Sequence, residues 1–458
     1  MKMAQLFGRD FQGKCIPLLG FIFLISSCKQ WTMDPEVQLG LTVIIAVITF
    51  VVIFTKPILG IYAVAAISIT FSPTVSMGFA NLYFHQWLIL IALLASISSG
   101  LLLENFHTRI RSEINVPMIV FVGSLLLSMA HAPNWVIGIK SFLYIGVLIA
   151  SYYLVLLCMN GERHIKVLTA LLIIATSVVC IISFRYHAAG RLGSFVLRNP
   201  NSFGNFLALV IPFSISLLLY GKLKSRKRFI LAFSISLMFI SLVLTFSRSA
   251  WVGVFASILS LLVFKPKGSL IFILCCIISA VFLFSPIHKR IFKDISDPGA
   301  QYRILKAKIA YKKFKENPIV GNGLGSFHYE SQFSEIWAYR AHSTLENNYL
   351  LMLAEGGMME FLAFLYLIIT FGKKAYFLLK RIQEPFLNAI LLGSVVSIIS
   401  TLAAGMFEDT LFFPKNNWLI GMFMGIVIVV ERIYEESLKT ADALGVEAAE
   451  KEQPSKWG

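Results

Sequence analysis

Long apolar runs separated by short polar connections dominate the chain. Runs of about 17–25 apolar residues are long enough for a helix to cross the hydrocarbon core of a bilayer. Such runs occupy residues 37–55, 58–79, 82–103, 116–131, 141–159, 165–184, 203–220, 229–246, 249–264, 269–285, 346–371, 386–408 and 416–431. The pattern predicts an all-α fold, a polytopic transmembrane helical bundle of about 12–14 spans.

The composition agrees with this prediction and excludes several other classes of protein. Hydrophobic residues make up 57% of the chain and charged residues only 14%, whereas about a quarter of the residues in a soluble domain are charged. A soluble globular protein and a disordered chain are therefore excluded. The six cysteines lie in or beside apolar runs without a CxxC spacing, so neither a disulfide framework nor a zinc site is expected.

The net charge of +16 reflects membrane topology and gives no reason to expect a nucleic-acid partner. Lysine and arginine gather in short connections, above all at 222–228, 265–267 and 373–381. Basic connections stay in the cytoplasm. Counting spans from these clusters places the loop 286–345 outside the cytoplasm, together with Arg248 at the outer face. The membrane lipids are then expected partners.

The extreme N-terminus allows three interpretations. Lys2, Arg9 and Lys14 precede a short apolar run that ends at Ile25-Ser26-Ser27-Cys28, which resembles a lipoprotein cleavage box. The alternatives are a short first helix, which we favour, or an upstream extension before Met33. The expected organisation is an N-terminal segment 1–36, helices 37–184, helices 185–285 with the outer-face arginines, the loop 286–345, helices 346–431 and a cytoplasmic tail 432–458.

The loop 286–345 is the only long hydrophilic insertion. Between Gln301 and Glu316 the apolar residues Ile304, Ala307, Tyr311 and Phe314 recur at helical spacing, with a basic face formed by Arg303, Lys306, Lys308, Lys312, Lys313 and Lys315. This pattern predicts an amphipathic helix on a membrane surface. For the lysines we favour a role in solvating the loop and touching lipid phosphates.

Three polar segments converge on the predicted outer face: 190–204, 245–251 and 341–357. Arg248 lies where two apolar runs meet, and a charge at that depth is costly unless it is paired or lines a polar cavity. A binding role for Arg248 is favoured over a snorkelling one. Glu355 is a second charge within apolar sequence, for which pairing with an arginine and binding of a ligand are equally good interpretations.

His342 lies where the chain returns from the loop to the membrane. A neutral imidazole can accept a proton from a hydroxyl near pH 7. Arginines can bind a diphosphate through forked hydrogen bonds and stabilise charge on a leaving group. A general base together with arginines can form a transferase site that needs no metal ion.

The sequence resembles the O-antigen ligase family, which includes related polymerases of lipid-linked glycans. The resemblance spans roughly residues 190–365 and depends on four short motifs, whose order around one large loop is fairly specific. They are Arg198-Asn199-Pro200-Asn201-Ser202-Phe203-Gly204, Thr245-Phe246-Ser247-Arg248-Ser249-Ala250-Trp251, Asn317-Pro318-Ile319-Val320-Gly321-Asn322-Gly323, and His342 with Asn347-Asn348-Tyr349 through Glu355-Gly356-Gly357.

The resemblance implies a GT-C-like fold in a bacterial inner membrane. It implies transfer of a glycan from an undecaprenyl-diphosphate-linked donor to the hydroxyl of a glycan or glycolipid acceptor, without metal or other cofactor. His342 would activate the acceptor, and Arg248 would hold the diphosphate with Arg303, Arg191 or Arg198. Other substrate-binding residues expected from the matching segments are Asn201, Asn347 and Glu355.

Three alternatives remain. The motifs do not separate a ligase, which transfers finished polymer, from a polymerase, which joins lipid-linked repeat units. A flippase or transporter is disfavoured because no internal repeat is evident and the polar residues gather at one face. A metal-dependent transferase could use Asp294 and Asp297, but Pro298 and Gly299 follow directly, which favours a turn or a helix start there.

Overall fold

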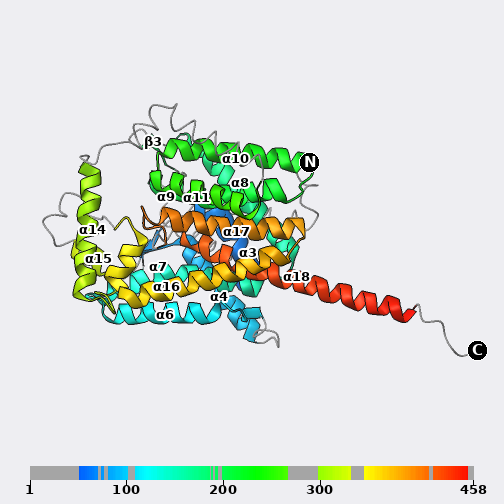
Figure 1. Ribbon diagram of the computed structural model, residues 1–458, viewed down its shortest axis with the longest axis horizontal. Helices are drawn as coiled ribbons and strands as arrows, with labels where there is room; N and C mark the ends of the chain where they lie inside the picture. The colour runs from blue at the N-terminus through cyan, green and yellow to red at the C-terminus, as the bar shows by residue number, and fades with distance from the viewer. Residues whose placement is uncertain are drawn as a thin grey trace, which may run out of the picture.

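The computed structural model describes residues 51–70, 74–76, 81–101, 109–185, 187–188, 191–193, 199–266, 298–331, 345–411 and 416–451. Within them the chain forms a helical bundle (Figure 1), which confirms the polytopic helical fold. The predictions for residues 1–36, for most of the span 37–55, for the span 269–285 and for Asp294, Asp297, Arg198 and His342 lie outside the described residues.

Most of the described helices are apolar, and α14 is the basic one. The helices are α3 (Pro57–Thr70), α4 (Phe84–Leu101), α6 (Asn115–Ala130), α7 (Trp135–Cys158), α8 (Glu162–Ser183), α9 (Pro200–Tyr220), α10 (Ser225–Thr245), α11 (Arg248–Phe264), α14 (Pro298–Glu316), α15 (Ser326–Ser331), α16 (Asn348–Arg381), α17 (Pro385–Ala404) and α18 (Asn417–Lys451). Two antiparallel strand pairs, β1 (Thr74–Ser76) with β2 (Asn81–Tyr83) and β3 (His187–Ala188) with β4 (Arg191–Leu192), lie in connections.

Seven of the described helices are long and apolar enough to cross a membrane, and α3, α4, α6 and α11 are shorter apolar helices. The expected spans at 82–103, 116–131, 141–159, 165–184, 203–220, 229–246 and 249–264 each correspond to one helix. The expected span 58–79 is too long, because α3 ends at Thr70 and strand β1 occupies Thr74–Ser76. The expected span 386–408 differs at its end, because α17 ends at Ala404 and Gly405 caps it. Glu408 therefore lies in the turn between α17 and α18 and not inside a span.

The centre of the bundle is formed by α9, α17 and α18. In the most apolar 18-residue stretch of α9, 89% of the residues are buried. The corresponding share in α10, which lies at the periphery, is 39%. Hydroxyls join the central helices: Ser216 donates to the Ala389 carbonyl at 2.8 Å and Ser397 to the Leu209 carbonyl at 2.6 Å. Small residues allow such close approach between membrane helices, and these contacts give the site a rigid support.

Different segments of the chain gather at the two ends of the bundle. One end holds the basic connections, where Lys265 donates to the Asn388 side chain at 2.5 Å and Lys374 pairs with Glu431 at 2.6 Å. The opposite end holds β3, β4, α14 and the first turns of α9, α11 and α16 (Figure 1). This separation agrees with the parity derived from the basic clusters, and we call the second end the outer end.

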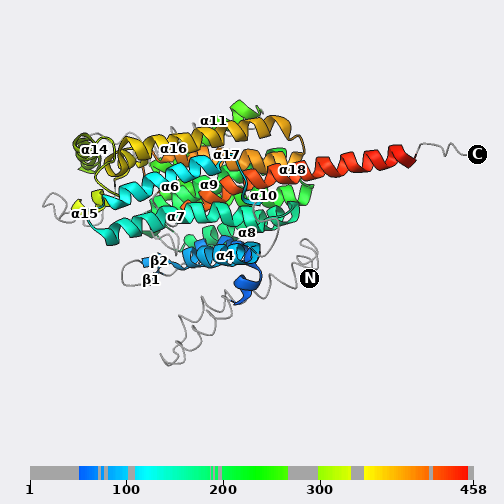
Figure 2. The same cartoon turned by 90° about the horizontal axis from the view of Figure 1, so that it is seen from below.

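Helix α14 lies across the outer end, transverse to the bundle helices in Figure 1 and seen nearly end-on in Figure 2. The helix itself confirms the sequence prediction, whereas its contact with a membrane surface stays a prediction. Ile304 and Tyr311 are exposed, whereas Lys306 and Ala310 are buried. The reason is that α14 packs on α16 and on the acidic Glu346, which favours a lysine on the inner side.

Candidate active site

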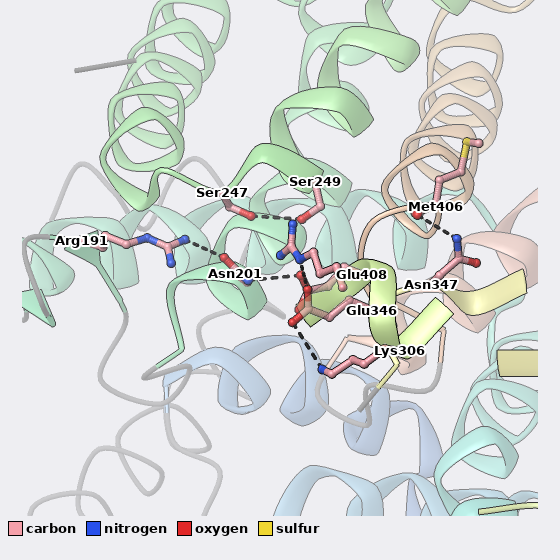
Figure 3. A network of polar contacts seen from close by, with 10 residues as sticks. Arg191, Asn201, Ser247, Ser249, Lys306, Glu346, Asn347, Met406 and Glu408 are labelled. Carbon is pink, nitrogen blue, oxygen red and sulfur yellow. Dashed lines mark hydrogen bonds and ion pairs between the residues drawn. The ribbon is translucent and has the colours of Figure 1, made fainter. Parts of the chain in front are cut away.

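Polar side chains from five separate segments meet at the outer end (Figure 3). We call this group the polar cluster, and the chain brings its members together from β4, α9, α14, the start of α16 and the turn after α17. The members are Arg191, Asn201, Arg303, Lys306, Glu346, Asn347 and Glu408. Four of the six substrate-binding residues expected from the sequence, namely Arg191, Asn201, Arg303 and Asn347, thus lie in one place.

Arg191 connects β4 to the turn that carries Arg248. Its Nε donates to the Thr245 carbonyl at 2.8 Å and one Nη to the Phe246 carbonyl at 3.3 Å. Phe246 has φ of 50°, a strained conformation for a residue with a side chain. The guanidinium therefore stabilises a tight turn from which α11 begins.

Arg248 is the first residue of α11 and is half-buried. The N-terminus of a helix presents unpaired N–H groups and a positive dipole, which favour a bound anion. The turn packs closely against α9, since a Cβ on Gly204 would lie 2.8 Å from the Ser247 Cβ. Two of the sequence motifs are thus one packed unit, and Arg248 begins a helix suited to anions.

Asn201 joins this unit to the turn after α17. Its side-chain oxygen accepts from Arg191 at 2.6 Å, and its side-chain nitrogen donates to Glu408 Oε2 at 3.1 Å. Asn199 caps α9 by accepting from the Asn201 backbone N–H at 2.9 Å. The Asn-Pro-Asn sequence therefore starts the helix and orients an amide between an arginine and a carboxyl group.

Glu346 contacts the two cationic side chains that α14 contributes to the polar cluster. Its carboxylate pairs with the Arg303 guanidinium and lies 3.8 Å from the Lys306 Nζ. Lys306 is only 1% exposed and lies over the Tyr302 ring at 4.7 Å. The expectation that the lysines of this helix serve to solvate it is therefore wrong for Lys306.

Asn347 fixes the beginning of α16. Its side-chain oxygen accepts from the Tyr349 and Leu350 N–H groups at 3.0 and 2.9 Å, and its side-chain nitrogen donates to the Met406 carbonyl at 3.0 Å. Such caps stabilise helices by about 1 kcal/mol. Asn347 thus aligns α16 with the turn that carries Glu408.

A pocket opens beside the polar cluster, with about 570 Å³ of empty space including its mouth. It is lined by four charged or polar residues, Arg303, Lys306, Glu346 and Asn347, and by six apolar ones, Ile304, Ala307, Leu345, Leu350, Met406 and Phe407. A pocket with both kinds of lining suits an amphiphile that carries an anionic group.

The surroundings change the ionisation of two groups in the polar cluster. Burial, followed by the charge of Asp409, raises the pKa of the Glu408 carboxyl to about 8, against the opposing effect of Arg303 and Arg191. Burial also lowers the pKa of the Lys306 ammonium, and Glu346 opposes that shift. Perturbed groups beside a pocket are typical of functional sites.

Glu355 lies apart from these residues. Its carboxylate is buried and accepts from the Gly325 and Phe327 backbone N–H groups at 2.9 and 3.1 Å. Gly357 breaks α16 at φ 63°, and a Cβ there would lie 2.4 Å from the Ile319 carbonyl oxygen. Glu355 thus binds the glycine-rich loop that follows α14 to a break in α16.

Sequence reasoning missed Lys306, Glu346 and Glu408. The adjacent acids Glu408 and Asp409 at the end of an apolar run were the available signal. Of the two catalytic residues expected from the sequence, the structure places Arg248 at the outer end, and His342 lies outside the described residues, as does Arg198. Among the described residues no group of three or more His, Cys, Asp or Glu side chains could hold a metal ion.

Residues 233–365 match the family model described as O-Antigen ligase. The match covers less than a third of the chain, and this segment is similar to the O-antigen ligase family. The matched segment includes the Arg248 turn, α14 and the glycine-rich loop, whereas Arg191, Asn201 and Glu408 lie outside it. A comparison with curated proteins found no match. The apolar helices indicate a multi-pass membrane protein, and the matched segment is similar to glycan ligases of this family.

Proposed function

We propose that the protein transfers a glycan from undecaprenyl diphosphate to an acceptor hydroxyl at the outer face of a bacterial inner membrane, without a metal ion. The observation that carries the proposal is that Arg191, Arg303 and the Arg248 turn lie at one end of the bundle, beside a pocket lined in part by charged side chains. A diphosphate leaving group needs cationic partners of this kind.

In this proposal the hydroxyl oxygen of the acceptor attacks the anomeric carbon of the donor sugar. The bond between that carbon and the diphosphate oxygen breaks, and undecaprenyl diphosphate leaves with the bonding electrons. His342 takes the hydroxyl proton, as the family resemblance implies. Arg248 and Arg303 bind the diphosphate and stabilise its developing charge.

Arg303 is a better second ligand for the diphosphate than Arg191. Arg303 lines the pocket, and its partner is a carboxylate that an incoming phosphate can replace by the same kind of hydrogen bond. Arg191 instead donates to main-chain carbonyls at Thr245 and Phe246, where it supports the Arg248 turn. Arg191 therefore acts as a positioning residue.

A polymerase of lipid-linked repeat units is the second candidate, because the same site chemistry serves both reactions. A flippase is disfavoured because the polar cluster lies at one end of the bundle and not at its middle.

A deletion strain separates these functions by what it accumulates. Lipid-linked long polymer indicates a ligase, single lipid-linked repeat units a polymerase, and repeat units confined to the cytoplasmic leaflet a flippase. Complementation by the wild type and by Arg226→Lys, an exposed change at the opposite end of the bundle, should restore the normal glycan. Failure of purified protein to transfer glycan from a lipid diphosphate donor would remove the proposal.

A further inference from the structure

The outward side of the second half of α14 combines lysines with exposed apolar groups. Lys308, Lys312 and Lys315 are exposed and recur at helical spacing. Tyr311 is 53% exposed, and the Lys315 Nζ lies over its ring at 4.7 Å. Ile319, just beyond the helix, is 65% exposed. We call these five residues the lysine face.

The lysine face continues the surface by which α16 meets the hydrocarbon of the membrane. The exposed apolar side chains of α16 begin immediately after its break and include Met358, Met359, Leu362, Tyr366 and Ile369. Main-chain hydrogen bonds join the two regions, because the Met358 N–H donates to the Pro318 carbonyl at 2.9 Å and the Met359 N–H to the Ile319 carbonyl at 3.1 Å. The lysine face thus begins where the lipid-facing side of α16 ends.

The orientation of α14 fits a position at the headgroup level. The helix runs transverse to the membrane-spanning helices (Figures 1 and 2), so its axis lies along the plane of the bilayer surface. Tyrosine and lysine are the residues that anchor a protein at this level, with the ring among the headgroups and the ammonium beside phosphate.

We propose that the lysine face binds the headgroups of anionic phospholipids in the outer leaflet of the membrane that carries the protein. The occupant is a bilayer surface because the lysines lie beside Tyr311 and Ile319, which offer an apolar contact, and because the face is continuous with the lipid-facing side of α16. Charge complementarity selects anionic over zwitterionic headgroups. This contact would tether to the bilayer surface the same helix that carries Arg303 and Lys306 into the polar cluster.

Photocrosslinking of the full-length protein tests the proposal without any glycan transfer. The photoreactive residue p-benzoylphenylalanine replaces Tyr311, and the protein is reconstituted in vesicles of about three parts phosphatidylethanolamine to one part phosphatidylglycerol. Mass spectrometry after irradiation identifies the attached lipid. Phosphatidylglycerol adducts should exceed the bulk proportion by about threefold or more.

A charge-matched pair of variants decides whether the lysines cause this enrichment. The triple variant Lys308→Gln, Lys312→Gln, Lys315→Gln should bring the adducts to the bulk lipid ratio. The control Lys222→Gln, Lys224→Gln, Lys227→Gln removes as many charges from the opposite end and should leave the enrichment intact. Adducts in the bulk ratio in the parent protein, a lack of lipid adducts, crosslinks to protein instead, or enrichment that survives the triple variant would each overturn the proposal. Because the vesicles hold no lipid-linked glycan, these outcomes are independent of the proposed function.

Discussion

Acidic side chains at the outer end of the bundle are accommodated in two different ways. Glu355 is fully enclosed and satisfied by two backbone N–H groups of the glycine-rich loop. Glu346 and Glu408 face arginine, lysine and asparagine side chains beside a pocket. Partners fixed in the backbone hold a fold in place, whereas side-chain partners can be exchanged for a ligand. We therefore expect Glu355 to stabilise the fold and the polar cluster to bind the substrate.

His342→Ala should have the largest effect on activity. Loss of a general base lowers turnover by about 100- to 10,000-fold, while insertion into the membrane should be unchanged. The measurement is glycan transfer from a lipid diphosphate donor by purified protein. The control is His131→Ala, which changes an exposed histidine directly after α6. An active His342→Ala protein would remove the assignment of the base.

Arg248→Lys should lower transfer on the order of 100-fold, because an ammonium cannot reproduce the forked contact of a guanidinium with phosphate. The same transfer assay checks this, with Arg226→Lys as the matched control. Near-normal turnover would leave Arg248 only a snorkelling role at the interface.

Glu355→Ala tests whether this buried carboxylate stabilises the fold. It leaves the Gly325 and Phe327 N–H groups buried without acceptors, which should lower the free energy of unfolding by about 2–5 kcal/mol. Thermal unfolding in detergent measures the loss, with the exposed Glu316→Ala as control. Transfer per folded molecule should stay near wild type; a stable but inactive protein would instead support the substrate-binding role expected from the sequence.

Arg191→Lys should have a smaller effect, a loss of about tenfold in turnover, because the lysine can keep only part of the contacts to Thr245, Phe246 and Asn201. As a positioning residue, Arg191 should affect kcat more than the KM for the donor. A rise in KM alone would indicate direct contact with the donor.

Glu408→Gln should have the smallest effect, visible as a change in pH dependence. The folded protein holds the Glu408 proton up to about pH 8, against an ordinary pKa of 4.5. The contribution of this carboxyl to stability is therefore complete below pH 4.5 and is lost as the pH rises toward 8. The glutamine stays neutral, so its thermal midpoint should increasingly exceed that of the wild type between pH 5 and 9. A constant difference would contradict the raised pKa.

Much of the site could be predicted from the sequence because its motifs lie in short connections between apolar runs. Arg191, Asn201 and Arg248 lie in such connections and Arg303 lies in the long loop 286–345, and the structure places all four at the same end. The roles of individual residues were less predictable. Glu355 was expected to bind substrate or pair with an arginine, but its partners are backbone N–H groups that appear only when the loop 321–327 folds onto α16.

The sequence by itself determined the helical membrane fold and predicted its orientation and the end at which the polar motifs gather, because hydropathy and the placement of lysine and arginine act along the chain. The tertiary structure decided which side of α14 is buried, where α17 ends and which carboxylates face cations. Those outcomes depend on contacts between residues far apart in sequence, such as Asn201 with Glu408 and Arg303 with Glu346. Their energies arise only when separate helices bring the partners within hydrogen-bonding distance.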